Sequence, residues 1–77
     1  MNTEWHVEIA RRAALHAVLS DPGRLAVVEL LSHGDHSPSE LSAELGMPSN
    51  LVAHHVGVLV EHGLVSRRRS ELKVRAK

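Results

Sequence analysis

The chain has 77 residues, no cysteine and a single aromatic residue, Trp5, so its core has to be small and built from aliphatic side chains. The lack of cysteine excludes disulfides, thiolate metal sites and thiol catalysis. No apolar run approaches the roughly 20 residues of a membrane span, and the first residues lack the basic-then-apolar order of a signal peptide. We therefore expect residues 1–77 to form a single domain, in the cytoplasm and without a membrane partner.

The formal net charge of zero hides an uneven distribution of charge along the chain. Residues 1–63 carry three basic and eight acidic side chains, a net charge of −5, whereas residues 64–77 carry six basic and one acidic, a net charge of +5. The basic residues of the second part are Arg67, Arg68, Arg69, Lys73, Arg75 and Lys77. Such an end is suited to a polyanion, although a solvated basic tail has the same composition.

The first helix is expected to begin after a cap at Asn2 or Thr3 and to run to about residue 19. Its apolar positions fall roughly on one stripe, formed by Trp5, Ile9, Ala13 and Val18 or Leu19. Trp5 is interpreted as an anchor of the core or of a dimer interface.

A second helix is predicted from "SDPGRL", where Asp21 caps the first turn and Pro22 takes the first helical position. The glycine of "HG", Gly34, is expected to end this helix in a left-handed turn. The residues predicted to face inward are Leu25, Val28 and Leu31.

Two further helices follow in tandem. The segment "SPSELSAELG" has Ser37 three residues before Glu40, the spacing of a capping box, and it stops at Gly46. The next helix begins near Pro48 or Ser49 and closes at Gly63. Its inward side is predicted to consist of Val52, Val56, Leu59 and Val60.

After Gly63 the pattern changes to "LVSRRRSELKVRAK", in which residues 64–69 and 72–75 are predicted to pair as a short antiparallel ribbon across Ser70 and Glu71. Four helices followed by a two-stranded ribbon make a mainly α protein. Two short helices in tandem joined by "LGMPSN", with a basic hairpin behind them, have the arrangement of a winged helix-turn-helix.

The segment from Leu19 to Arg69 resembles the ArsR-type winged-helix repressors in four motifs that occur in the right order. They are the "DP-x-RL" opening, the "ELA-x-x-LG" helix, which reads "ELSAELG" here, the "HH-x-x-x-L" recognition helix and the "GLV" entry to the wing. The resemblance implies that the fourth helix lies in the major groove of double-stranded DNA and presents its first two turns to base edges. It also implies transcriptional regulation, by repression, as the function.

The outward face of the fourth helix follows from geometry alone, because successive helical residues are about 100° apart. With Val52, Val56 and Leu59 turned inward, the outward residues are Asn50, Ala53, His54 and Gly57. The residues predicted to contact bases are Ser49, Asn50, Ala53 and His54, and those predicted to contact phosphates are Arg67, Arg68, Arg69 and Lys73.

The histidines are not expected to form a metal site. His54 and His55 diverge on their helix, and His55 and His62 are about 10 Å apart by helical rise. We expect His55 to be partly buried with a hydrogen bond to a backbone group, and His62 to interact with the dipole at the helix end. The loop histidines His33 and His36 are expected to be solvated. No cofactor is predicted, and no nucleophile with a base and an orienting group can be placed, so an enzyme is not expected.

The sequence departs from the ArsR-type pattern in two respects. Without cysteines it has no thiol sensor, and the recognition face carries Leu51, Ala53 and Gly57 where members of the family tend to have small hydroxyl residues and a lysine. An alternative function is therefore an appended interaction or regulatory domain that has lost specific DNA binding. Such a domain would be excised from a longer chain, for instance one fused to an enzyme such as an arsenate reductase. The resemblance further suggests a homodimer that uses the first helix.

Overall fold

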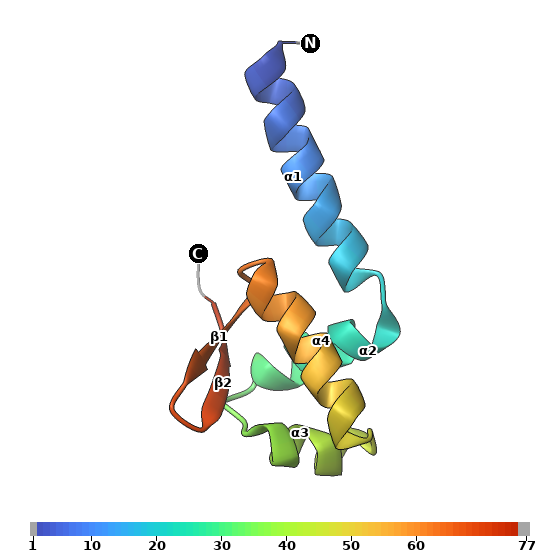
Figure 1. Ribbon diagram of the computed structural model, residues 1–77, viewed down its shortest axis with the longest axis vertical. Helices are drawn as coiled ribbons and strands as arrows, with labels where there is room; N and C mark the ends of the chain where they lie inside the picture. The colour runs from blue at the N-terminus through green and yellow to red at the C-terminus, as the bar shows by residue number, and fades with distance from the viewer. Residues whose placement is uncertain (1, 76–77) are drawn as a thin grey trace.

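The computed structural model describes residues 2–75 as four helices followed by a two-stranded hairpin, which confirms the predicted fold class (Figure 1). The elements are α1 (Thr3–Leu19), α2 (Pro22–Leu31), α3 (Pro38–Leu45), α4 (Ser49–Glu61), β1 (Val65–Arg68) and β2 (Glu71–Val74). Helices α2, α3 and α4 and the hairpin form one body, and α1 extends away from it as an arm (Figure 1). No helix within residues 2–75 combines the length and the hydropathy needed to cross a bilayer.

The first three helices begin at the side-chain caps that the sequence predicts. Asn2 accepts a hydrogen bond from the Trp5 backbone N–H at 2.8 Å, and Asp21 accepts one from the Arg24 N–H at 3.0 Å. Ser37 and Glu40 form the reciprocal capping box, with distances of 3.2 and 2.8 Å. Each cap satisfies a backbone donor that a helix start would otherwise leave free, which fixes where the helix begins.

Two of the predicted helix ends are confirmed, and one is displaced. Gly46 and Gly63 adopt positive φ angles of 61° and 74° after α3 and α4, the left-handed conformation that glycine adopts most easily. Helix α2 instead ends at Leu31, before the predicted Gly34. Its C-cap is Ser32, whose hydroxyl donates to the Glu29 carbonyl oxygen at 2.6 Å.

The core lies between α2, α3, α4 and the hairpin. Its buried apolar residues are Val18, Val27, Leu31, Leu41, Val52, Val56, Leu59, Val65 and Leu72. The prediction that Leu25 faces inward is wrong, because its side chain is 44% exposed and Val27 takes the inward position. Positions 27 and 31 are about 40° apart around a helix, whereas positions 25 and 31 are about 120° apart and cannot share a narrow face.

The apolar stripe of α1 is largely outside the core. Trp5 is 56% exposed and Ile9 is 40% exposed, and Val18 near the end of the helix is the residue of α1 that is buried. The interpretation of Trp5 as a core anchor is therefore wrong within one chain. The physical reason is that α1 joins the body at its last turn and its first turns project away from the other described elements (Figure 1).

The hairpin forms as predicted, but its turn lies one residue earlier. Strand pairing runs from Val65 opposite Val74 to Arg68 opposite Glu71, so the turn consists of Arg69 and Ser70, and Glu71 belongs to β2. Arg69 has a φ of 57°, a conformation in which side chains other than glycine are uncommon. On its other edge β2 is paired by an isolated bridge to His36, with backbone hydrogen bonds of 2.7 and 3.3 Å between His36 and Leu72.

Candidate nucleic-acid interface

Helix α4 divides into a buried side and an exposed side, as the sequence predicts. Val52, Val56 and Leu59 are buried against the core. The predicted base-contacting residues are all exposed, namely Ser49, Asn50, Ala53 and His54. The structure thus leaves the first turns of α4 open to a partner along one continuous face.

The predicted phosphate-contacting residues of the hairpin are also exposed, but they do not share one face. Paired residues in an antiparallel ribbon point to the same side and successive residues alternate. Arg68 therefore lies on the same face as its partner Glu71 and as Lys73, whereas Arg67 lies on the face of its partner Leu72. Arg69 stands at the turn. Lys77, counted with the basic end of the sequence, lies outside the described residues.

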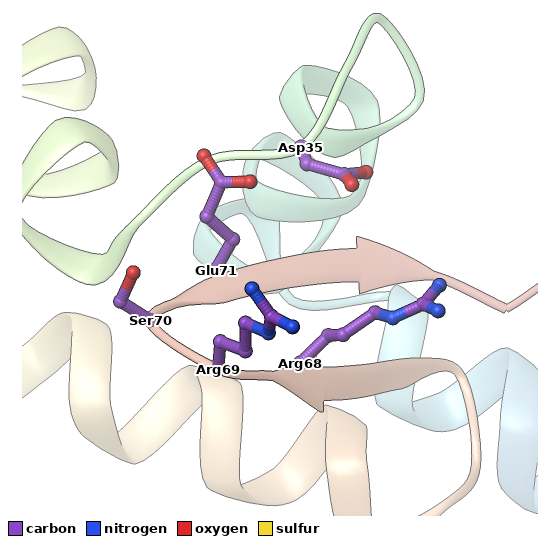
Figure 2. A pocket seen from close by; sticks show the side chains of 5 residues that line it. All are labelled: Asp35, Arg68, Arg69, Ser70 and Glu71. Atoms are coloured by element: carbon purple, nitrogen blue, oxygen red, sulfur yellow. The ribbon is translucent and has the colours of Figure 1, made fainter.

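A shallow hollow of about 300 Å³ lies at the tip of the hairpin (Figure 2). Its lining residues are Asp35, Arg68, Arg69, Ser70 and Glu71. Asp35 comes from the loop before α3, and Figure 2 shows its carboxylate above the hairpin, in which Arg68 ends β1 and Arg69 lies in the turn. The sequence analysis missed this neighbour, because no local pattern places residue 35 beside residues 68 and 69.

The carboxylates of Asp35 and Glu71 lower the positive potential at the tip of the hairpin. Neither of them forms an ion pair with Arg68 or Arg69. Among the ion pairs within residues 2–75, none involves Arg67, Arg68 or Arg69. The guanidinium groups therefore retain their donors for an anionic partner. In Figure 1 the hairpin and the first turns of α4 lie at the same end of the molecule, opposite the free end of α1.

His55 is more deeply buried than predicted, with 6% of its surface exposed. Among residues 2–75 its Nδ1 has no hydrogen-bond partner, and its Nε2 lies 3.8 Å from the Asp21 carboxylate. The expected hydrogen bond to a backbone group is therefore absent for this ring. His55 instead packs against the first turn of α2, where Gly23 has no side chain.

The first turn of α2 also contacts α1. Arg24 donates from Nε to the Val18 carbonyl oxygen at 2.8 Å, so the guanidinium of this basic residue is engaged in a contact within the fold. The "DP-x-RL" motif thus has a structural use: Asp21 caps α2, and Arg24 ties that cap to the end of α1.

Asp21 is expected to make stability sensitive to acid. The hydrogen bond from the Arg24 N–H lowers the pKa of its carboxyl below the ordinary 3.8, and the nearby charges of Arg24 and His55 act in the same direction. A carboxyl with a depressed pKa contributes stability above its unfolded pKa, and this contribution is lost as the pH falls through the folded value.

Replacing Asp21 with asparagine keeps the capping oxygen but removes the titration. We expect Asp21→Asn to unfold at nearly the wild-type urea concentration at pH 7, and to lose less stability than wild type between pH 5 and pH 2.5. Urea unfolding curves across this pH range provide the measurement. An equal loss of stability in both proteins would contradict the assignment.

Two of the remaining histidines contact other groups of the fold. The prediction that His36 is solvated is wrong: its Nε2 is 3.0 Å from the Glu44 carboxylate and its Nδ1 is 2.8 Å from the Gly34 carbonyl oxygen. His62 Nδ1 contacts the Val58 carbonyl oxygen at 2.9 Å near the end of α4. Within the described part of the chain, no three His, Asp or Glu residues are grouped in a way that could hold a metal ion.

Comparison with known proteins places this arrangement in a family. Residues 19–68 match the family model described as a helix-turn-helix domain. An uncharacterized HTH-type transcriptional regulator from Mycobacterium tuberculosis is 36% identical over 59 residues, which are 75% of this chain and 52% of that protein. An arsenical resistance operon repressor from Staphylococcus xylosus is 36% identical over 53 residues, which are 69% of this chain and 51% of that protein.

Solved structures share the fold. The winged helix-turn-helix DNA-binding domain of Mb0332 from Mycobacterium bovis, a possible ArsR-family transcriptional regulator, matches with a TM-score of 0.89 and 19% identity. The match covers 99% of this chain and 74% of that one. The present chain spans about half the length of the curated relatives that it matches. From the family model and these relatives, the chain belongs to the helix-turn-helix domain family and, as its motifs indicate, to the ArsR-type winged-helix proteins.

Proposed function

We propose that this chain is the DNA-binding domain of a transcriptional regulator that represses by occupying an operator. The observation that carries the proposal is the placement of an exposed helix face and a basic hairpin at one end of the same body (Figure 1). A helix of this size fits the major groove, where base edges can be distinguished, while cations beside it can contact the backbone. A cytoplasmic location and the absence of enzymatic activity belong to the same proposal.

The proposed roles follow from position. Ser49, Asn50 and His54 face base edges, and Ala53 allows close approach or contacts a thymine methyl group. The residues proposed to contact phosphates are Arg67, Arg68, Arg69 and Lys73. Because Arg67 and Arg68 lie on opposite faces of the ribbon, we propose that the hairpin inserts its tip between phosphates instead of lying flat on one strand.

His54→Ala is expected to change which duplex is preferred without changing how salt affects binding. A base-edge contact carries discrimination of about 1–3 kcal/mol, whereas counterion release comes from phosphate contacts. We expect His54→Ala to reduce the preference for a duplex selected by the wild type from a random library about 10-fold relative to a shuffled duplex. Fluorescence anisotropy titrations at several salt concentrations measure both quantities.

The matched control is His62→Ala, because His62 is an exposed histidine at the far end of α4 and outside the proposed reading face. Its preference is expected to equal that of the wild type. If the wild-type chain binds no duplex even at low ionic strength, the DNA-binding function is wrong, and the appended interaction domain takes its place.

We further propose that two copies associate through the exposed face of α1 that contains Trp5 and Ile9. These residues are about 40° apart around the helix, and both are exposed although they are large and apolar. The related Mb0332 domain is described as homodimeric. Trp5→Glu is expected to convert a dimer into a monomer in sedimentation velocity experiments, because it would bury a charge in the interface.

Val7→Glu is the control for the dimer, because Val7 is also exposed but lies on the opposite side of α1. We expect this variant to remain dimeric. If both variants stay dimeric, or if the wild type is monomeric at all concentrations, the proposed role of this face is wrong.

A further inference from the structure

The packing of His55 on Gly23 has the geometry of a positioning contact between the recognition helix and the helix before it. A Cβ atom built on Gly23 would lie 2.5 Å from His55 Nε2 and 3.1 Å from its Cδ2. Non-bonded heavy atoms essentially never lie closer than 3.0 Å to a Cβ atom. The ring therefore occupies a seat that is open only because residue 23 is glycine.

The polar ring is retained in the core although it lacks a full set of partners. His55 is the buried polar residue among the described residues, and its Nδ1 makes no hydrogen bond. A buried unsatisfied nitrogen is unfavourable, and an aliphatic residue would fill the position without that penalty. The ring is thus better explained by its shape and by its contact with Asp21, 3.8 Å from Nε2, than by a contribution to stability.

The seat lies on the first turn of α2, which side-chain hydrogen bonds cap and join to α1. Asp21 accepts the Arg24 N–H at 3.0 Å, and Arg24 donates to the Val18 carbonyl oxygen at 2.8 Å. The first turn of α2 is consequently tied to the last turn of α1. A ring seated on this turn places α4 relative to both helices.

His55 is also next to the reading face. The rings of His54 and His55 have centroids 5.6 Å apart and planes tilted by 54°. One side of α4 packs into the core through Val52, Val56 and Leu59. The side toward α2 packs on Gly23 through His55. A rotation of α4 about its own axis would move the His55 ring out of its seat and turn His54 in the same direction.

We propose that His55 is a positioning residue for DNA reading: seated on the Gly23 backbone, it fixes the rotation of α4 and hence the direction of Asn50 and His54. This inference rests on the proposed DNA-binding function. It predicts that filling the seat disturbs discrimination between sequences and leaves the phosphate contacts of the hairpin unchanged.

The test compares the wild-type chain with Gly23→Ala, His55→Ala and the double variant. The probes are a 25-base-pair duplex enriched from a random library by the wild type and a shuffled duplex of the same composition. Gly23→Ala is expected to lose at least 10-fold of the preference for the enriched duplex, while affinity for the shuffled duplex and its salt dependence change less than about 2-fold. His62→Ala is the control, because His62 is exposed at the end of α4 and lies outside the proposed reading face.

Gly23→Ala and His55→Ala are expected to disturb the same contact, the packing of His55 on Gly23. The double variant should therefore lose no more preference for the enriched duplex than either single variant. If Gly23→Ala is unfolded by circular dichroism, His55→Ala carries the same test at a temperature where it is folded. Preserved discrimination in folded variants, an equal loss of affinity for both duplexes, or multiplicative losses would overturn the inference and leave the DNA-binding function intact. A wild type that binds no duplex would overturn both.

Discussion

The affinity of the chain for duplex DNA is expected to fall steeply as the salt concentration rises. Each phosphate contact releases about 0.9 counterion, so contacts by three of the four proposed cations give a log-log slope of affinity against salt concentration of roughly −2.7 for one chain and twice that for a dimer. Between 50 and 200 mM salt, affinity should fall about 40-fold for a monomer and about 2,000-fold for a dimer. Anisotropy titrations at five or more salt concentrations measure the slope.

Two single substitutions at the tip of the hairpin should change this binding in opposite directions. Arg68→Ala is expected to weaken binding to all sequences alike and to reduce the slope by about one unit per chain. Asp35→Asn removes a carboxylate from the same hollow, so it should strengthen binding to all sequences and leave the number of phosphate contacts unchanged. Binding that is independent of salt, or a loss of affinity in Asp35→Asn, would contradict the proposed placement of the phosphates.

Leu31→Ala is expected to be among the most destabilising substitutions in the chain. Leu31 is 3% exposed in the core, and truncating a buried leucine costs about 2–5 kcal/mol. A domain of this size has a free energy of unfolding of roughly 4–12 kcal/mol, so this substitution removes a large share of it. Urea unfolding followed by circular dichroism measures the difference.

Leu25→Ala on the same helix is the matched control. Leu25 is 44% exposed, and its truncation is expected to cost less than about 1 kcal/mol. Equal effects of the two substitutions would show that α2 is rotated relative to the described core, and a larger effect of Leu25→Ala would restore the inward face predicted from the sequence.

The parts of the fold that could be predicted from the sequence are those decided within one or two helical turns. Asp21 and the Ser37–Glu40 pair fix helix starts through hydrogen bonds to backbone groups three residues away, and a local pattern reveals them. The exposed face of α4 was predictable for the same reason: three inward valine and leucine residues determine where the remaining side chains point.

The parts that were missed depend on contacts between distant segments. Asp35 lies beside the hairpin tip because the loop before α3 pairs with β2 through His36, and neither residue 35 nor residue 36 signals this. The burial of His55 depends on Gly23, 32 positions earlier. The exposure of Trp5 was unpredictable because an apolar stripe has the same appearance whether its partner is the same chain or another copy.

The positive φ of Arg69 makes the tip of the hairpin a compromise between folding and binding. A residue with a side chain in the left-handed region is disfavoured by roughly 1–2 kcal/mol, a penalty that glycine does not have. Arg69→Gly would therefore make the turn easier to form while removing a cation from the surface proposed to meet DNA. Selection of this chain for thermal stability alone would favour that substitution. It would yield a more stable domain with a lower affinity for its proposed DNA partner.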